Sequence, residues 1–141
     1  MRFNCMAVVL AAAAGIARAA PAAAAAEALS NTLEGRNNFK YSCVPLWLDY
    51  TDKTILHAWC YASRGNLQRD FLPLNECLSN QDGKLVAAKN GNYGASCDLA
   101  SCKLKGSVLS CKCKKFAQEP EDTSIELNDI ITNKNGKMRC F

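Results

Sequence analysis

Cysteine is the residue type with the widest chemistry in this sequence, which has 141 residues and nine cysteines. Cysteine side chains either pair as disulfides or bind metals such as zinc as thiolates. The single histidine, His57, excludes chemistry that needs two histidines. The length allows one ordinary domain or two very small ones, which excludes most large enzyme scaffolds. A formal charge of +4 is too small to predict nucleic-acid binding, so we expect no nucleic-acid partner.

The start of the chain has the pattern of a secretory signal peptide. Arg2 precedes an apolar stretch over 8–16, and Ala17-Arg18-Ala19 has the small-x-small form that signal peptidase cleaves. A membrane-spanning helix needs roughly 20 consecutive apolar residues, and Arg18 and Pro21 interrupt the stretch before that length. We therefore expect residues 1–19 to be a signal peptide and the mature protein to be secreted, extracellular and without a membrane span.

Cleavage after residue 19 would change both the charge and the cysteine count. The mature chain keeps 15 basic and 13 acidic residues, a charge of +2, and it loses Cys5. Eight cysteines remain, and an even number in a secreted chain favours four disulfides. Zinc is the alternative for the Cys97-x4-Cys102 and Cys111-x-Cys113 spacings, but zinc sites more often use Cys-x2-Cys pairs in reducing compartments. We therefore predict disulfides and no metal.

The sequence after the predicted signal peptide contains an internal repeat. The segment Leu74–Leu85 returns as Leu127–Met138, with five of twelve positions identical. Other landmarks repeat at offsets of 53 or 54 residues, so we interpret the sequence as a tandem duplication with repeats at 38–91 and 92–141. Residues 20–37 are rich in alanine and contribute little to a core, which indicates a flexible spacer. A short helix over 22–34 is the alternative, because alanine is the best helix former.

The residue pattern of each repeat predicts β-strands. Apolar and polar residues alternate around Leu56 and Cys60, and again from Leu109 to Cys113. The Asp82-Gly83 and Asn135-Gly136 pairs favour the positive φ angles of tight hairpin turns. Copies of about 50 residues bury too little surface to fold alone, so they should share one core. Alternation also turns His57 outward, and we expect it to be a surface residue.

These motifs together resemble the cyanovirin-N homology (CVNH) family of lectins over 38–141. The resemblance rests on Leu-Asn-acid followed by Asn-x-(Asp/Asn)-Gly in each copy, and on the Asn-aromatic-x-x-Ser-Cys openings. It also rests on Gly106-Ser107-Val108-Leu109 and on Cys113-Lys114-Lys115-Phe116-Ala117-Gln118. It implies an all-β fold of two pseudosymmetric halves that exchange strands, with short 3-10 turns. It further implies non-covalent binding of glycans, often mannose-rich, without a cofactor.

The resemblance assigns one sugar site to each half. The better supported site takes its residues from the first hairpin turn, the opening of the second repeat and the strand after Cys113: Ser79, Asn80, Asp82, Asn92, Ser96, Lys115 and Gln118. The second site takes Tyr41, Ser42, Tyr61, Ser63, Asn133 and Asn135. Short polar side chains suit sugar hydroxyls, which both donate and accept hydrogen bonds. The alternative is that the asparagines and aspartate only build turns.

The resemblance also suggests how the cysteines pair. It implies the bonds Cys43–Cys60 and Cys97–Cys113 between the first two strands of each repeat. Cys102 and Cys111 flank the Lys105-Gly106 turn and could face each other, which leaves Cys77 and Cys140 to tie the final strand to the first repeat. Because eight cysteines allow 105 pairings, this set is a hypothesis.

Two features favour a different class of function. Ala95 and Phe116 stand where well-known CVNH members carry polar sugar contacts, so the scaffold could instead be a secreted effector or protein-interaction module. We find no catalytic motif and predict that the protein is not an enzyme. Five lysines cluster on one expected hairpin and form either a solvated face or a surface for an anionic partner: Lys103, Lys105, Lys112, Lys114 and Lys115. We expect a monomer, with a domain-swapped dimer as the alternative.

Overall fold

The computed structural model describes residues 39–141. The signal peptide and spacer that we predict for 1–19 and 20–37 lie outside these residues. Within the described part the chain is mostly β-structure, with only short helical turns, as the sequence predicts. The described helices are all too short to cross a membrane.

The two repeats contain the same elements in the same order. Each has a helical turn, a three-stranded antiparallel sheet, a 3-10 turn and a two-stranded hairpin. The first repeat contains α2 (Phe39–Ser42), β1 (Cys43–Leu48), β2 (Ile55–Tyr61), β3 (Leu67–Pro73), η1 (Leu74–Glu76), β4 (Leu78–Gln81) and β5 (Lys84–Ala87). The second contains η2 (Tyr93–Ala95), β6 (Cys97–Lys105), β7 (Val108–Lys115), β8 (Gln118–Glu126), η3 (Leu127–Asp129), β9 (Ile131–Lys134) and β10 (Lys137–Cys140).

The strands form because their residues alternate between a buried and an exposed face. In β2, Leu56 and Ala58 are fully buried while Trp59 and Tyr61 are exposed, and β7 alternates in the same way. The hairpin turns of β4–β5 and β9–β10 use glycines with positive φ, +89° at Gly83 and +81° at Gly136. This is the backbone conformation that glycine adopts at no steric cost.

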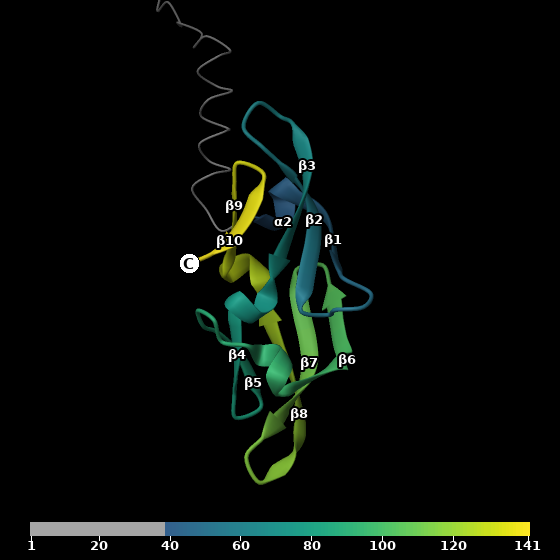
Figure 1. Cartoon of the computed structure of the whole chain (residues 1–141), viewed down its shortest axis with the longest axis vertical. Helices are drawn as coiled ribbons and strands as arrows, with labels where there is room; N and C mark the ends of the chain where they lie inside the picture. Colours follow the sequence, from purple (N-terminus) through teal and green to yellow (C-terminus); the bar gives the residue numbers. More distant parts are fainter. Residues whose placement is uncertain (1–38) are drawn as a thin grey trace, which may run out of the picture.

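The hairpin of each repeat packs against the sheet of the other. The β4–β5 hairpin lies beside β8, and the β9–β10 hairpin lies beside β3 (Figure 1). All four sheets are hydrogen-bonded within one repeat, so the repeats meet through side-chain packing, through hydrogen bonds such as those of Asn80 and Asn133, and at one isolated backbone bridge between Ser79 and Asn92. The strand exchange that the resemblance implies therefore stays a prediction. One core of buried side chains runs through both repeats, and its largest members are Tyr93, Phe39, Leu56, Leu74, Leu78, Leu109, Leu127, Ile131 and Met138.

Four disulfides join all eight cysteines of the described residues. Two connect the first two strands of a repeat, Cys43–Cys60 and Cys97–Cys113, and a third, Cys102–Cys111, lies in the β6–β7 hairpin. Cys77–Cys140 joins the first repeat to the last strand. These are the four pairs expected from the sequence. Each closes a loop in the unfolded chain, which stabilises the fold by roughly 2–4 kcal/mol per bond.

Candidate functional site

The side chain of Asn80 holds together three segments that are distant in sequence. Its Nδ2 donates to Ser96 Oγ at 3.1 Å and to the carbonyl oxygen of Lys114 at 2.9 Å. Its Oδ1 accepts a hydrogen bond from the N–H of Gly83 at 2.8 Å. Both amide protons are therefore used inside the protein. Asn80 therefore joins the β4–β5 turn, the residue after η2 and the end of β7. We call the residues predicted for this site the Asn80 cluster: Ser79, Asn80, Asp82, Asn92, Ser96, Lys115 and Gln118.

Asp82 fixes the other side of the same turn. Its Oδ1 accepts a hydrogen bond from the N–H of Phe116 at 2.8 Å, and its φ of 49° lies in the left-handed region that aspartate tolerates. The second carboxylate oxygen of Asp82 has no partner among the described residues. The Ser79 hydroxyl and the amide groups of Asn92 and Gln118 are likewise without a side-chain partner in this part of the chain. The cluster therefore combines a rigid frame with unused donors and acceptors.

Lys115 belongs to the frame of the Asn80 cluster. Its Nζ lies 3.1 Å from Glu121 Oε2, and both side chains would meet a Cβ at Gly83 at 3.4 Å. The pair therefore packs beside the hairpin turn, and the carboxylate balances the charge of Lys115. Sequence reasoning missed Glu121. Glu121 lies 53 residues after Gln68, and the structure places Gln68 beside the other hairpin turn in the same way.

The hairpin of the second repeat makes similar hydrogen bonds. We call the residues predicted for this second site the Asn133 cluster: Tyr41, Ser42, Tyr61, Ser63, Asn133 and Asn135. Asn133 Nδ2 donates to the carbonyl oxygen of Tyr61 at 2.8 Å, and its Oδ1 accepts from Gly136 N–H at 2.8 Å. Asn135 Oδ1 accepts from the N–H of Ser63 at 2.8 Å and from its hydroxyl. Asn133, Asn135 and Gly136 follow Asn80, Asp82 and Gly83 by 53 residues each.

The two clusters differ in charge and in access. Asp82 carries a carboxylate where Asn135 carries a neutral amide. Ser96 and its counterpart Ser42 both donate to a carbonyl oxygen three residues earlier, but only Ser96 also accepts a hydrogen bond from the site asparagine, and Ser42 is only 6% exposed. Tyr41 is 68% exposed, and neither Tyr41 nor Ser42 bonds to Asn133. Side-chain hydrogen bonds between predicted residues join one pair at the Asn80 cluster, Asn80 with Ser96, and two pairs at the Asn133 cluster, Asn133 with Tyr61 and Asn135 with Ser63. The Asn80 cluster differs in leaving more of its polar side-chain groups unused and in carrying a carboxylate.

The lysines of the β6–β7 hairpin are interleaved with acids. Lys112 on β7 lies between Asp98 on β6 and Asp122 on β8 in the strand register. Lys103 and Lys112 line an open cavity of about 340 Å³ together with Asp122. Because carboxylates share this face, its net positive charge is smaller than the lysine count suggests, and the arrangement favours a solvated face.

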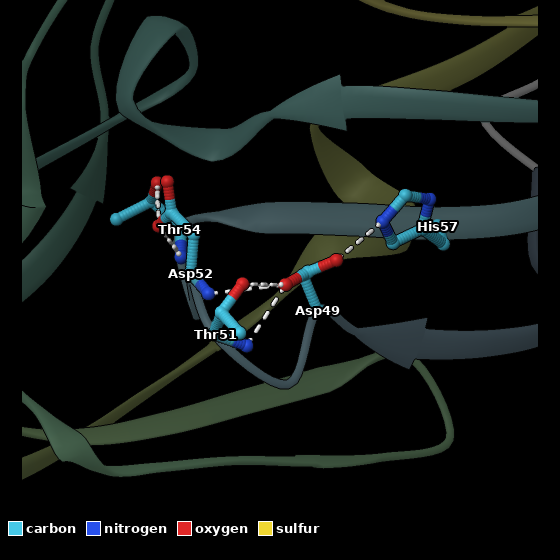
Figure 2. A network of polar contacts seen from close by, with 5 residues as sticks. All are labelled: Asp49, Thr51, Asp52, Thr54 and His57. Atoms are coloured by element: carbon cyan, nitrogen blue, oxygen red, sulfur yellow. Dashed lines mark hydrogen bonds and ion pairs between the residues drawn. The ribbon is translucent and has the colours of Figure 1, made fainter.

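His57 lies on the outward side of β2, yet its side chain is only 13% exposed. The prediction of a surface histidine is wrong because Trp47 and Phe71 on neighbouring strands cover the ring, with centroids 5.4 and 6.3 Å away. Its Nε2 lies 3.1 Å from Asp49 Oδ2 (Figure 2). Asp49 is itself held by the hydroxyl and N–H of Thr51, at 2.7 and 2.9 Å.

The hydrogen bonds around Asp49 stabilise its charged form. The Thr51 hydroxyl first, then the N–H groups of Asp52 and Thr51 and the ring of His57, hold the pKa of the Asp49 carboxyl well below its usual range. A second turn follows at once, where Asp52 Oδ1 accepts from the N–H and hydroxyl of Thr54 (Figure 2). Two successive acid-threonine turns thus fix the loop between β1 and β2.

The CVNH domain model matches residues 39–139, nearly the whole described part. The chain belongs to the CVNH family. Solved CVNH structures also share its fold, among them GzCVNH from Gibberella zeae, at 25% identity and a TM-score of 0.64, covering 74% of this chain and 97% of that protein. A complex of microvirin with mannobiose matches at 28% identity and a TM-score of 0.61, covering 73% and 97% of the two chains. A variant of MoCVNH3 in complex with (N-GlcNAc)4 matches at 18% identity and a TM-score of 0.67, covering 74% and 97%. No curated protein sequence matches the chain.

Proposed function

We propose that this CVNH protein is a lectin that binds oligosaccharides non-covalently, first at the Asn80 cluster and more weakly at the Asn133 cluster. One observation at the Asn80 cluster carries the proposal. The side chain of Asn80 makes all its hydrogen bonds within the protein, while polar groups beside it have no partner among the described residues. The amide group of Asn80 is fully hydrogen-bonded and positions the turn, while Asp82, Ser79 and Asn92 have donors and acceptors available for a ligand. Sugar hydroxyls need both kinds of group at fixed positions.

The relatives support a glycan as the ligand. Microvirin, a structural match at 28% identity, was solved with mannobiose. The proposal therefore includes mannose-containing oligosaccharides as the first ligands to test. It assigns a binding role and no catalytic one, because the cluster presents one free carboxylate, that of Asp82, and glycoside hydrolysis usually requires two.

The replacement Asp82→Asn tests the proposal without breaking the frame. The amide oxygen can still accept the Phe116 N–H, while the free carboxylate oxygen becomes an amide and matches Asn135 in the other cluster. We expect mannobiose to bind about tenfold more weakly, since a hydrogen bond to a charged group contributes about 1.5–3 kcal/mol. The thermal midpoint should stay within about 2 °C. Glu76→Gln, an exposed acid outside both clusters, is the matched control.

A glycan array with the mature protein comes first. Mannose- and GlcNAc-terminated oligosaccharides should be retained, and isothermal titration then gives the affinities of the two variants. An array with no bound glycan would end the lectin proposal and would favour a protein-interaction module on the same scaffold. The exposed Phe116, 88% accessible beside the Asn80 cluster, is the feature that supports this alternative.

We also propose that the protein is secreted. Four disulfides in about one hundred residues support this, because disulfides persist in oxidising compartments and are rare in the cytosol. Mass spectrometry of the protein recovered from culture medium should give a chain that begins at Ala20. Retention inside the cell with a free Met1 would contradict the proposal.

A further inference from the structure

The outward side of β2 and β3 is largely aromatic and apolar. The buried residues of β2 alternate with those that face solvent, and the same alternation holds from Arg69 onward in β3. Trp59, Tyr61 and Phe71 are 40%, 48% and 62% exposed. Arg69 is the one residue of fixed charge among the eight outward positions of the two strands. We call this surface the aromatic face: Ile55, His57, Trp59, Tyr61, Leu67, Arg69, Phe71 and Pro73.

The second repeat shows that the fold does not require such a surface. The equivalent strands β7 and β8 have the same register up to a shift after Cys113; β7 buries the matching residues, and the inward residues of β8 are partly buried. Their outward positions, 53 residues later in the sequence, are mostly small or charged: Val108, Ser110, Lys112, Lys114, Pro120, Asp122, Ser124 and Glu126. Because the same scaffold is stable with a polar face in one half, the aromatic face in the other half points to a ligand.

The centre of the aromatic face is held rigidly. Trp47 on β1 stacks on His57 with an interplanar angle of 17°, and the guanidinium of Arg69 lies 5.5 Å from the Trp47 ring. His57 is tethered to Asp49, which the threonine turn fixes in place (Figure 2). Side chains that are already ordered, as Trp47, His57 and Arg69 are here, lose little further entropy when a ligand binds beside them.

The area and charge of the face select the kind of ligand. At about 200 Å² per aromatic side chain, the exposed parts of Trp59, Tyr61 and Phe71 amount to about 300 Å². A stable protein interface buries about 800 Å² on each partner, well above what these three rings expose. With no carboxylate and one guanidinium at its outward positions, it suits an uncharged ligand. The apolar C–H faces of pyranose rings are such a ligand, because they pack against aromatic rings.

The aromatic face meets the Asn133 cluster at Tyr61, whose carbonyl oxygen accepts a hydrogen bond from Asn133. Gln68, which donates from Nε2 to the carbonyl oxygen of Asn135 at 3.1 Å, lies on the other side of β3 from Leu67 and Arg69. Tyr61 thus belongs to both surfaces. From Tyr61 to His57 the strand runs for about 13 Å, at about 3.3 Å per residue, which is longer than two linked pyranose rings.

We propose that the aromatic face is an extended glycan-binding surface, on which an oligosaccharide held at the Asn133 cluster continues along β2 and packs its sugar rings on Tyr61, Trp59 and Phe71. The inference rests on the proposed lectin function and adds a preference for longer chains. Each ring contact contributes little alone, so the expected signature is an affinity that rises with the number of sugars.

The test compares short and long glycans on matched variants. We expect the GlcNAc tetrasaccharide and mannotetraose to bind about tenfold more tightly than the corresponding disaccharides. Trp59→Ala and Phe71→Ala should each weaken tetrasaccharide binding about three- to tenfold and leave disaccharide binding unchanged. Trp59→Phe should retain most of the affinity. Lys112→Ala and Ser124→Ala, at the equivalent positions of the other repeat, are the controls and should change neither.

Tryptophan fluorescence gives an independent measurement. The chain has two tryptophans, and both Trp47 and Trp59 lie on the outward side of this sheet. Tetrasaccharides should change the emission while disaccharides leave it nearly unchanged. Equal affinity for both lengths, or equal losses for both in Trp59→Ala, would overturn the inference and leave the lectin function standing. Self-association that Trp59→Ala abolishes, without an effect on glycans, would also overturn it. Absence of all glycan binding would refute the lectin function itself.

Discussion

Replacing Asn80 with alanine should destabilise the protein more than the same change at Asn133. Asn80→Ala removes two donated hydrogen bonds and one accepted bond, whereas Asn133→Ala removes one of each. A net contribution of about 1 kcal/mol per bond gives losses of about 3 and about 2 kcal/mol. The difference between the two variants comes from the bond to Ser96, which has no counterpart in the second repeat.

The size of the loss also depends on what is left unpaired. Alanine at position 80 leaves the Lys114 carbonyl, at an exposed strand end, free to bond with water. Gly83 is a buried residue, but its bond to Asn80 is only partly buried, so water can replace at most part of that bond. The full cost of an orphaned buried group is therefore not reached, and about 3 kcal/mol is the upper end of the expected loss.

Guanidinium unfolding with the disulfides intact measures these losses. The midpoint concentration should fall in both variants at an unchanged slope, because the same surface is exposed on unfolding. For a domain of about 100 residues, 3 kcal/mol corresponds to a fall in the thermal midpoint of about 12–24 °C. Asn66→Ala, an exposed asparagine without a side-chain hydrogen bond, is the control and should change stability by less than about 0.5 kcal/mol.

A double-mutant cycle isolates the Ser96 bond. Asn80→Ala combined with Ser96→Ala should show a coupling energy of about 1 kcal/mol. A loss at Asn133 equal to or larger than that at Asn80, or a coupling near zero, would refute the assignment of Asn80 as the residue that joins three segments.

Two further predictions concern the disulfides and the dependence of stability on pH. Replacing both Cys77 and Cys140 with alanine should lower the free energy of unfolding by about 4 kcal/mol, and replacing Cys102 and Cys111 should lower it by about 3 kcal/mol. The first disulfide joins residues 63 apart and the second residues 9 apart, so the first restricts the unfolded chain more. Denaturant unfolding measures both losses, and the reverse order would contradict this reasoning. Asp49→Asn should lower the thermal midpoint at pH 7, and the difference from wild type should shrink progressively as the pH falls below about 4. The depressed pKa of Asp49 stabilises the fold above the ordinary carboxyl pKa, and this contribution disappears as pH falls towards the folded-state value. A difference between wild type and variant that stays constant with pH would contradict this cause.

The local pattern of the sequence accounts for much of the fold. Alternation around Leu56 and Leu109 predicts strands that the structure contains, and the Asp82-Gly83 and Asn135-Gly136 pairs predict turns at the observed places. These features depend on neighbours a few residues apart, so a single sequence is enough to find them. The resemblance to a known family added the two inter-strand cysteine pairs and brought the residues of both clusters to attention.

The sequence could not predict which partner each polar side chain would choose. Lys115 is a member of a lysine cluster in the sequence, but the register of β7 and β8 brings Glu121 to it. Ser42 and Ser96 occupy matching positions, yet the first is buried. His57 is outward by alternation, yet the rings of two other strands cover it. Each of these outcomes is set by contacts across strands or between repeats, which strand alternation does not encode.

The bond between Cys77 and Cys140 changes what a single cut in the backbone can do. The peptide segment 88–92 is the backbone connection between the two repeats, and the disulfide is a second, independent one. A protease that cleaves after Lys89 would therefore leave one covalent molecule, which separates into two fragments only after reduction. Such a nicked protein would keep both clusters and the aromatic face on one particle. Under the proposed secretion and the proposed glycan binding at both clusters, the protein would stay bivalent after an extracellular protease had cut this peptide bond.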